Sequence, residues 1–298
     1  MSRLNHPVDS APSRRQYRAS AKTTSWFTSL EGFPVSTATP IPVRSPLPSA
    51  LSGSTAVLIG GSSGIGLAAA VLLRSVGARV VLVGRDPDRL KAAVSRVRGA
   101  SPAEDRDDAV LAVAGDGGDE QTLAEACDRA GRVDHVFVTA GGISGAGPLP
   151  GLSADDIRTT LDSRLQAAFT AARAAATRLP AGGSLTFSSG ILVVRPAPGM
   201  SAPLSVVGAV ETLTRALAVE LAPARLRVNA VRFGRIDTPL LRSAPGLDSD
   251  DAIAAAGSTA PLGRFGTAEE AAASALFLMA NNYVTGQVIT VDGGETLA

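Results

Sequence analysis

The chain has 298 residues, 45% of them hydrophobic, so it is long enough to bury a sizeable core in one large domain with extensions. Its 28 basic and 27 acidic residues give a net charge of +1, which provides no field that would attract nucleic acid or an anionic membrane. One cysteine, Cys127, and two histidines exclude an internal disulfide framework and disfavour a dedicated zinc site. These counts favour a small-molecule substrate as the partner, and a cytoplasmic location is expected.

Residues 1–50 form an extension rich in Ser, Thr, Pro and Arg, with Asp9 and Glu31 as its acids. The segment shows neither helical nor strand periodicity, which predicts disorder. An organelle transit peptide would also be basic and Ser-rich, so that alternative stays open beside an unstructured tail. The uncharged stretch from Ser45 to Leu73 has the length of a membrane span, but its prolines and glycine cluster are not those of a transmembrane helix.

From Leu51 onward, short β-branched runs alternate with longer amphipathic or alanine-rich segments. Continuous apolar runs separated by helices predict parallel strands that are buried on both faces. Residues 51–298 are therefore expected to form a single-domain Rossmann fold, an α/β doubly wound parallel sheet of about seven strands flanked by helices. The predicted strands are Ala56–Ile59, Val80–Val83, Val110–Ala114, Val133–Val138, Ser184–Phe187, Val228–Val231 and Val288–Val291.

A glycine turn follows the first predicted strand. Gly60, Gly64 and Gly66 precede the predicted helix Leu67–Val76. Glycines permit tight turns and close approach of a pyrophosphate to the helix N-terminus, where free N–H groups and the helix dipole favour anions. The turn predicts a dinucleotide site.

The end of the second predicted strand indicates which dinucleotide. An acid at this place would accept the ribose hydroxyls of NAD, but the chain has Gly84 followed by Arg85. A guanidinium pairs well with a 2′-phosphate, so the sequence favours NADP(H). The alternative is a solvated arginine in the turn before Asp86.

Further motifs occur in order along the chain. They are Asp116 after the third strand, Ala140-Gly141 after the fourth, Arg227-Val228-Asn229-Ala230, Tyr283-Val284-Thr285-Gly286-Gln287 and Val291-Asp292-Gly293-Gly294. Together with the glycine turn, they resemble the short-chain dehydrogenase/reductase family over residues 51–298.

The resemblance implies a nicotinamide enzyme that transfers hydride between NAD(P)H and a carbonyl or alcohol. It also implies roles for single positions. Ser62, Ser63 and Ile65 would line the phosphates, Asp116 would contact the adenine, Ala140 and Gly141 would lie near the ribose, and Thr238 would contact the carboxamide side of the cofactor.

The catalytic pair of that family is missing. Matching the helix that ends at Leu221 places Pro203 at the family's tyrosine, Val207 at its lysine and, on an earlier helix, Arg164 at its asparagine. The chain has no tyrosine or lysine between Lys91 and Tyr283, so no shift of register restores the pair. Loss of a positioned general acid typically costs ~10²–10⁴-fold in rate. The scaffold is expected to survive, because proline is accepted in a first helical turn, here with Ser201 as the cap.

The residues whose side chains hold the glycine turn by hydrogen bonds also differ from those of the family. Ile59 stands where the family has threonine, and Val138-Thr139 stands where it has two asparagines. Both changes are expected to remove side-chain hydrogen bonds that brace the turn, while leaving space for the cofactor.

Ser189 and Arg164 are the remaining catalytic candidates. Ser189 matches the family's serine and would orient a carbonyl, and Arg164 would stabilise negative charge or bind a substrate carboxylate. His135 comes early in its strand, away from the carboxyl ends, so a packed histidine is expected there. Arg195 and Asp237 are further candidates for the cleft wall.

Three functional classes remain open. The first is an oxidoreductase whose substrate needs no tyrosine acid, such as an iminium or an activated enone. The second is a redox-inactive NADP(H)-binding sensor or partner subunit, and the third is a non-redox enzyme, such as a cyclase or dehydratase.

The assembly is also left open by the sequence. In the family that the chain resembles, helices matching Arg158–Leu179 and Leu204–Leu221 contact another subunit, which implies a homodimer or homotetramer. The alternative is that their small residues let the helices pack on their own sheet.

Overall fold

Seven parallel strands form the central sheet of the computed structural model, which describes residues 47–100, 108–139, 141 and 145–298. The strand order β3-β2-β1-β4-β5-β6-β9 reverses between β1 and β4, as in a doubly wound sheet, so the predicted fold is confirmed. The strands are β1 Thr55–Ile59, β2 Arg79–Gly84, β3 Val110–Ala114, β4 His135–Val138, β5 Ser184–Gly190, β6 Arg227–Phe233 and β9 Val288–Val291. A separate pair, β7 Ile236–Asp237 and β8 Gly266–Thr267, is also parallel.

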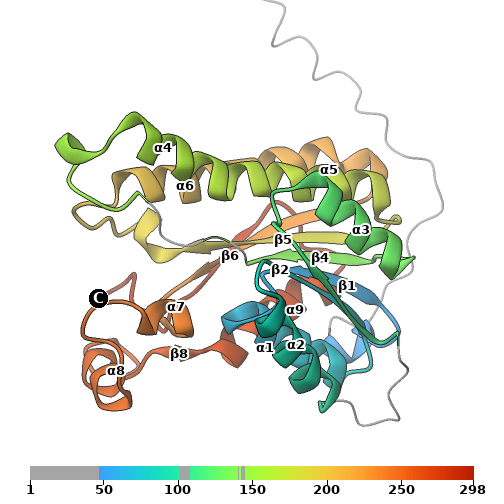
Figure 1. Ribbon diagram of the computed structural model, residues 1–298, viewed down its shortest axis with the longest axis horizontal. Coiled ribbons are helices and arrows are strands. Elements are labelled where there is room, and N and C mark those ends of the chain that lie inside the picture. The colour runs from blue at the N-terminus through green and yellow to red at the C-terminus, as the bar shows by residue number, and fades with distance from the viewer. Residues whose placement is uncertain (1–46, 101–107, 140, 142–144) are drawn as a thin grey trace, which may run out of the picture. The chain divides into compact units, whose positions relative to one another are not determined.

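Helices cover both faces of the sheet (Figure 1). On one face lie α1 Gly64–Ser75, α2 Pro87–Arg98 and α9 Ala268–Ala280. On the other face lie α3 Glu120–Ala130, α4 Ala154–Leu161, α5 Ala167–Arg178 and α6 Ser201–Glu220. Two short helices, α7 Pro239–Arg242 and α8 Asp250–Gly257, follow β7.

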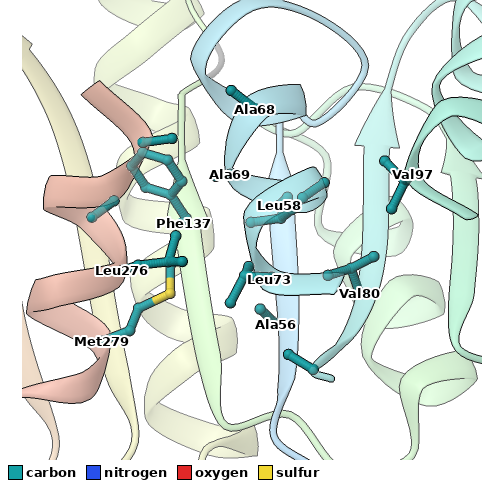
Figure 2. Close-up of a cluster of buried hydrophobic side chains, with 14 of the residues drawn as sticks. Ala56, Leu58, Ala68, Ala69, Leu73, Val80, Val97, Phe137, Leu276 and Met279 are labelled. Atoms are coloured by element: carbon teal, nitrogen blue, oxygen red, sulfur yellow. The ribbon is translucent and has the colours of Figure 1, made fainter. Parts of the chain in front are cut away.

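The core is divided between the two faces because successive strand residues point in opposite directions. Figure 2 shows the cluster under α1 and α9, where Leu58 and Phe137 of the strands meet Leu73, Leu276 and Met279 of the helices. The second cluster lies beneath α3, α5 and α6 and includes Ile59 and Phe187. Both faces bury apolar surface, which explains the continuous apolar runs of the sequence.

Three local predictions are corrected by the structure. The predicted helix Arg158–Leu179 is interrupted by a π-helical turn, Asp162–Gln166, which separates α4 from α5. Ser201 does not cap α6: it is the first helical residue, and Met200 occupies the cap position without a side-chain bond. A 3-10 turn, Pro48–Leu51, begins inside the segment predicted to be disordered, because Leu51 is buried in the core. The rest of that segment, residues 1–46, lies outside the described residues.

Helix α6 has the length and composition of a membrane span. In the described part of the chain its apolar side is nevertheless buried, with Val206, Val210 and Leu217 all inaccessible. The helix contacts β5 and β6, so its apolar character is that of a core helix.

Candidate active site

The glycine turn forms the first turn of α1, which begins earlier than predicted, at Gly64. Gly60 and Gly64 have φ values of 91° and 50°, in the left-handed region that favours glycine. A Cβ on Gly66 would lie 2.3 Å from the carbonyl oxygen of Gly60, so only glycine fits there. The absence of a side chain at Gly66 therefore lets α1 pack directly against the backbone of the turn.

Thr139 braces this turn. Its Oγ1 donates toward the carbonyl oxygens of Ile59 at 3.2 Å and Gly60 at 3.3 Å. The expectation that the change to Val138-Thr139 removes side-chain bracing is therefore wrong, because the threonine hydroxyl supplies it.

The N-terminus of α1 is left open toward the turn. Ser63 holds the cap position and makes no side-chain capping hydrogen bond. Ser62, Ser63, Gly64 and Ile65 are all partly exposed. Amides of a first helical turn have no intrahelical partner, so this turn can donate to an anion, as the sequence predicts.

The end of β2 lies beside the same turn. A Cβ on Gly84 would meet the Ser62 hydroxyl oxygen at 2.9 Å, so an acidic side chain does not fit at this position unless Ser62 moves. Arg85 is exposed, and Asp86 caps α2 by accepting from the amides of Asp88 and Arg89. Among the described residues Arg85 makes no hydrogen bond or ion pair, which leaves its guanidinium available to a phosphate.

Thr238 lies opposite the turn, 3.5 Å from where a Cβ on Gly64 would be. It caps α7, with its Oγ1 3.5 Å from the amide of Leu241. Asp116 is exposed at the end of β3, where its Oδ1 accepts from the amide of Gly118 at 2.8 Å. Gly141 follows β4, whereas its predicted companion Ala140 lies outside the described residues.

Pro203 and Val207, which the sequence comparison expects at the positions of the family's tyrosine and lysine, both lie on α6. Both are buried on α6, Val207 with 8% exposure, one helical turn apart. Neither side chain can donate a proton. Pro203 lies in the first turn of the helix, as predicted.

A buried polar network lies one turn deeper along the same stripe of α6. The Ser189 hydroxyl donates to Glu211 Oε1 at 2.6 Å. Arg232 of β6 donates to both oxygens of Glu211, from Nε at 2.9 Å and from Nη2 at 2.6 Å. Ser189 and Glu211 are 6% and 4% exposed, so these two members of the network are buried.

The hydrogen bond to Glu211 decides whether Ser189 can donate to a substrate. Burial raises the pKa of Glu211, but the hydrogen bonds from Arg232 and Ser189 outweigh it and hold the pKa below its ordinary value. The carboxylate thus keeps the only proton of the Ser189 hydroxyl, and the serine can only accept from a ligand. The predicted role of orienting a carbonyl needs this same proton.

Arg164 projects from the π-helical turn onto the segment after β4. Its Nη2 donates to the Gly141 carbonyl at 3.3 Å, and its Nε is 2.7 Å from where a Cβ on Gly141 would lie. Burial lowers the pKa of Arg164, and no carboxylate offsets this effect. A guanidinium still remains protonated in a protein.

The other candidates have different partners. Asp237 is paired with Arg242, whose Nε and Nη2 lie 2.6 Å and 2.8 Å from its carboxylate. Arg195 donates to the backbone carbonyls of Glu295 and Ala298. His135 is buried, with Nδ1 2.8 Å from the Ser184 hydroxyl at the amino ends of the strands, as expected for a packed histidine.

Among the described residues, no group of three or more His, Cys, Asp or Glu side chains is placed to hold a metal ion. Cys127 is buried in the core beneath α3. The uncapped first turn of α1 is suited to an anion.

Comparison with known proteins gives matches over most of the chain. The family model described as enoyl-(acyl carrier protein) reductase matches residues 60–296. The short-chain dehydrogenase/reductase malC of Malbranchea aurantiaca is 32% identical over 260 residues, which are 83% of this chain and 96% of that protein.

Solved structures agree with these matches. The structure of MalC Reductase/Diels-Alderase from Malbranchea aurantiaca has a TM-score of 0.76 at 30% identity, covering 84% of this chain and 99% of that chain. L-sorbose reductase from Gluconobacter frateurii, solved with NADPH and L-sorbose, has a TM-score of 0.72 at 27% identity, covering 83% and 98% of the two chains.

Proposed function

Because the chain belongs to the short-chain dehydrogenase/reductase family, whose members use nicotinamide cofactors, we propose that it is an NADP(H)-dependent reductase working without the tyrosine–lysine pair. One observation carries this proposal. The glycine turn Gly60–Gly66 leaves the first amides of α1 without a side-chain cap, and Arg85 follows the neighbouring strand. The chain nevertheless has no tyrosine or lysine between Lys91 and Tyr283.

The described residues fit the cofactor. The amides of the first α1 turn would bind its pyrophosphate, and Gly66, which packs directly against the Gly60 carbonyl, holds α1 close to the turn. Arg85 would pair with the 2′-phosphate, and Thr238 would close the cleft opposite Gly64. When bound, NADPH supplies a hydride from C4 of its nicotinamide.

The substrate must suit a site without a tyrosine. Hydride addition to an unactivated ketone produces an alkoxide that needs a proton, and loss of a positioned acid slows such a step ~10²–10⁴-fold. Hydride addition to an iminium gives a neutral amine, with no proton required. Addition to an enone gives an enolate, which Arg164 can stabilise until solvent protonates the carbon. We therefore propose an activated C=N or C=C bond as the group reduced.

A second candidate is a non-redox cyclase. It is favoured by the likeness to MalC, which is named as a Diels-Alderase as well as a reductase. Buried Pro203 and Val207 would give such a pocket an apolar wall. This enzyme would turn over without consuming NADPH, and a redox-inactive sensor would bind NADPH without any turnover.

Replacing Arg85 by glutamine is expected to weaken NADPH binding about tenfold or more, because a charge-assisted bond to the 2′-phosphate is lost. NADH has no 2′-phosphate, so its affinity is expected to stay the same. Isothermal calorimetry of the full chain with each cofactor measures both values. The matched control is Arg89→Gln, an exposed arginine of α2 whose partner is Asp86.

The wild-type chain is expected to prefer NADPH over NADH. Equal affinity for the two cofactors would contradict the NADP(H) assignment. Absence of binding by either would overturn the proposed reductase and the sensor alike.

A further inference from the structure

Arg164 has no carboxylate partner among the described residues, in contrast to the half-buried Arg232 and Arg242. Arg232 is paired with Glu211, and Arg242 is paired with both Asp237 and Asp250. Arg164 makes one long hydrogen bond to a neutral carbonyl, that of Gly141. Its remaining donors have no partner among the described residues.

A charge in this position is costly without a counter-charge. A guanidinium has five N–H donors, and burying it without an anion is unfavourable because water solvation is lost. Here only burial shifts the pKa of Arg164, and it shifts it downward. An anionic ligand would remove that cost and take two donors at once in the fork geometry that suits a carboxylate.

The contacts of Arg164 connect it with the glycine turn and with α6. Thr139 contacts Gly60 of the glycine turn, and Gly141, two residues further along, accepts from Arg164. The π-helical turn that carries Arg164 contacts α6, the helix of Pro203 and Val207. π-Helical turns occur frequently at functional sites, since the extra residue alters the direction of a side chain.

We propose that Arg164 binds a carboxylate of the substrate and thereby selects acids over neutral compounds. This inference rests on the proposed reductase for the identity of the substrate, but the anion site itself requires only Arg164. The positive charge also disfavours a cationic iminium unless the same molecule has a carboxylate.

The experiment is calorimetry on the full chain with saturating NADPH. The probes are acetate, pyruvate and benzoate, each compared with its neutral primary amide. At least one carboxylate is expected to bind about tenfold more tightly than its amide. In Arg164→Gln this preference is expected to fall below about twofold, and in Arg164→Lys it is expected to be intermediate, because the charge stays and the fork is lost.

Arg158→Gln is the matched control, because it removes the same charge from the neighbouring helix α4 at an exposed arginine paired with Asp155. It is expected to keep the full carboxylate preference. Circular dichroism is used to check that each variant is folded. If Arg164→Gln does not fold, Arg164→Lys is used in its place to test the carboxylate preference.

Equal binding of carboxylates and amides by the wild type would overturn the inference, as would an unchanged preference in Arg164→Gln. The titrations are repeated without NADPH. Carboxylate binding without any NADPH binding would support the anion site and reject the reductase. NADPH binding without a preference for carboxylates would reject the anion site and leave the proposed reductase standing.

Discussion

Gly66→Ala is expected to abolish measurable cofactor binding and to lower the free energy of unfolding by about 3 kcal/mol, the upper end of the usual cost of overpacking. The added methyl would lie 2.3 Å from the Gly60 carbonyl oxygen and 2.7 Å from Thr139 Oγ1. The threonine can rotate, but the carbonyl belongs to the backbone of the turn. Relief therefore requires Gly60 to move, which changes the cradle and weakens NADPH binding at least about a hundredfold.

Gly99→Ala is the matched control. Gly99 ends α2 with ordinary helical dihedrals, and a Cβ there would meet only ordinary contacts at 3.7 Å. Calorimetry with NADPH and chemical denaturation should leave this control close to wild type. Normal cofactor binding by Gly66→Ala would show that NADPH binding does not depend on the position of Gly60 in this turn.

Glu211→Ala is expected to lower the free energy of unfolding by about 3–5 kcal/mol, because removing one partner of a buried ion pair leaves the other charge uncompensated. Arg232, whose side chain is 15% exposed, would lose its carboxylate partner, and the Ser189 hydroxyl would lose its acceptor. Chemical denaturation measures this loss. The matched control is Glu220→Ala, at the exposed end of the same helix, which should cost less than about 1 kcal/mol.

The contribution of Glu211 to the free energy of unfolding is expected to depend on pH. Its pKa lies below the ordinary value of 4.5, so the carboxylate contributes stability above that pH, and the contribution is lost as the pH falls through the folded pKa. The destabilisation caused by Glu211→Gln is therefore expected to be larger at neutral pH than in acid. A destabilisation that is independent of pH, or no greater than that of Glu220→Ala, would contradict the buried ion pair.

The sheet and the glycine turn were predictable because their signals are local. Val80–Val83 is apolar throughout and lies in a strand whose inner residues are buried, and such a pattern is visible in a few residues. The glycines at 60, 64 and 66 follow such a run directly. Strand ends were less predictable: β5 and β6 continue to Gly190 and Phe233, where cross-strand pairing rather than apolar character sustains them.

The buried network was missed because its members are far apart in the chain. Glu211 meets Ser189 and Arg232 across more than twenty residues on either side, through the packing of α6 on the sheet. A signal was present: Glu211 follows Pro203 and Val207 at helical spacing on a buried stripe, and Arg232 interrupts the apolar end of β6. The π-helical turn at Arg164 has no comparable signal, because helix formers continue from α4 through the turn into the alanine-rich α5.

The homodimer or homotetramer and the cytoplasmic location stay predictions. They concern contacts with other molecules and the cell, which strand periodicity does not determine. The adenine contact of Asp116 also stays a prediction, although its place at the carboxyl end of β3 suits it.

Transfer of deuterium from NADPH labelled at nicotinamide C4 is the most direct measurement of the reductase without a tyrosine acid. The full chain is incubated with a panel of enones, cyclic imines and unactivated ketones, with and without a carboxylate, and mass spectrometry locates the label. Deuterium is expected on carbon in the activated compounds. Transfer to unactivated ketones is expected to be slower by a factor of about 10² or more. Equally fast transfer to unactivated ketones, or no transfer to any compound by a chain that binds NADPH, would contradict the proposed reaction.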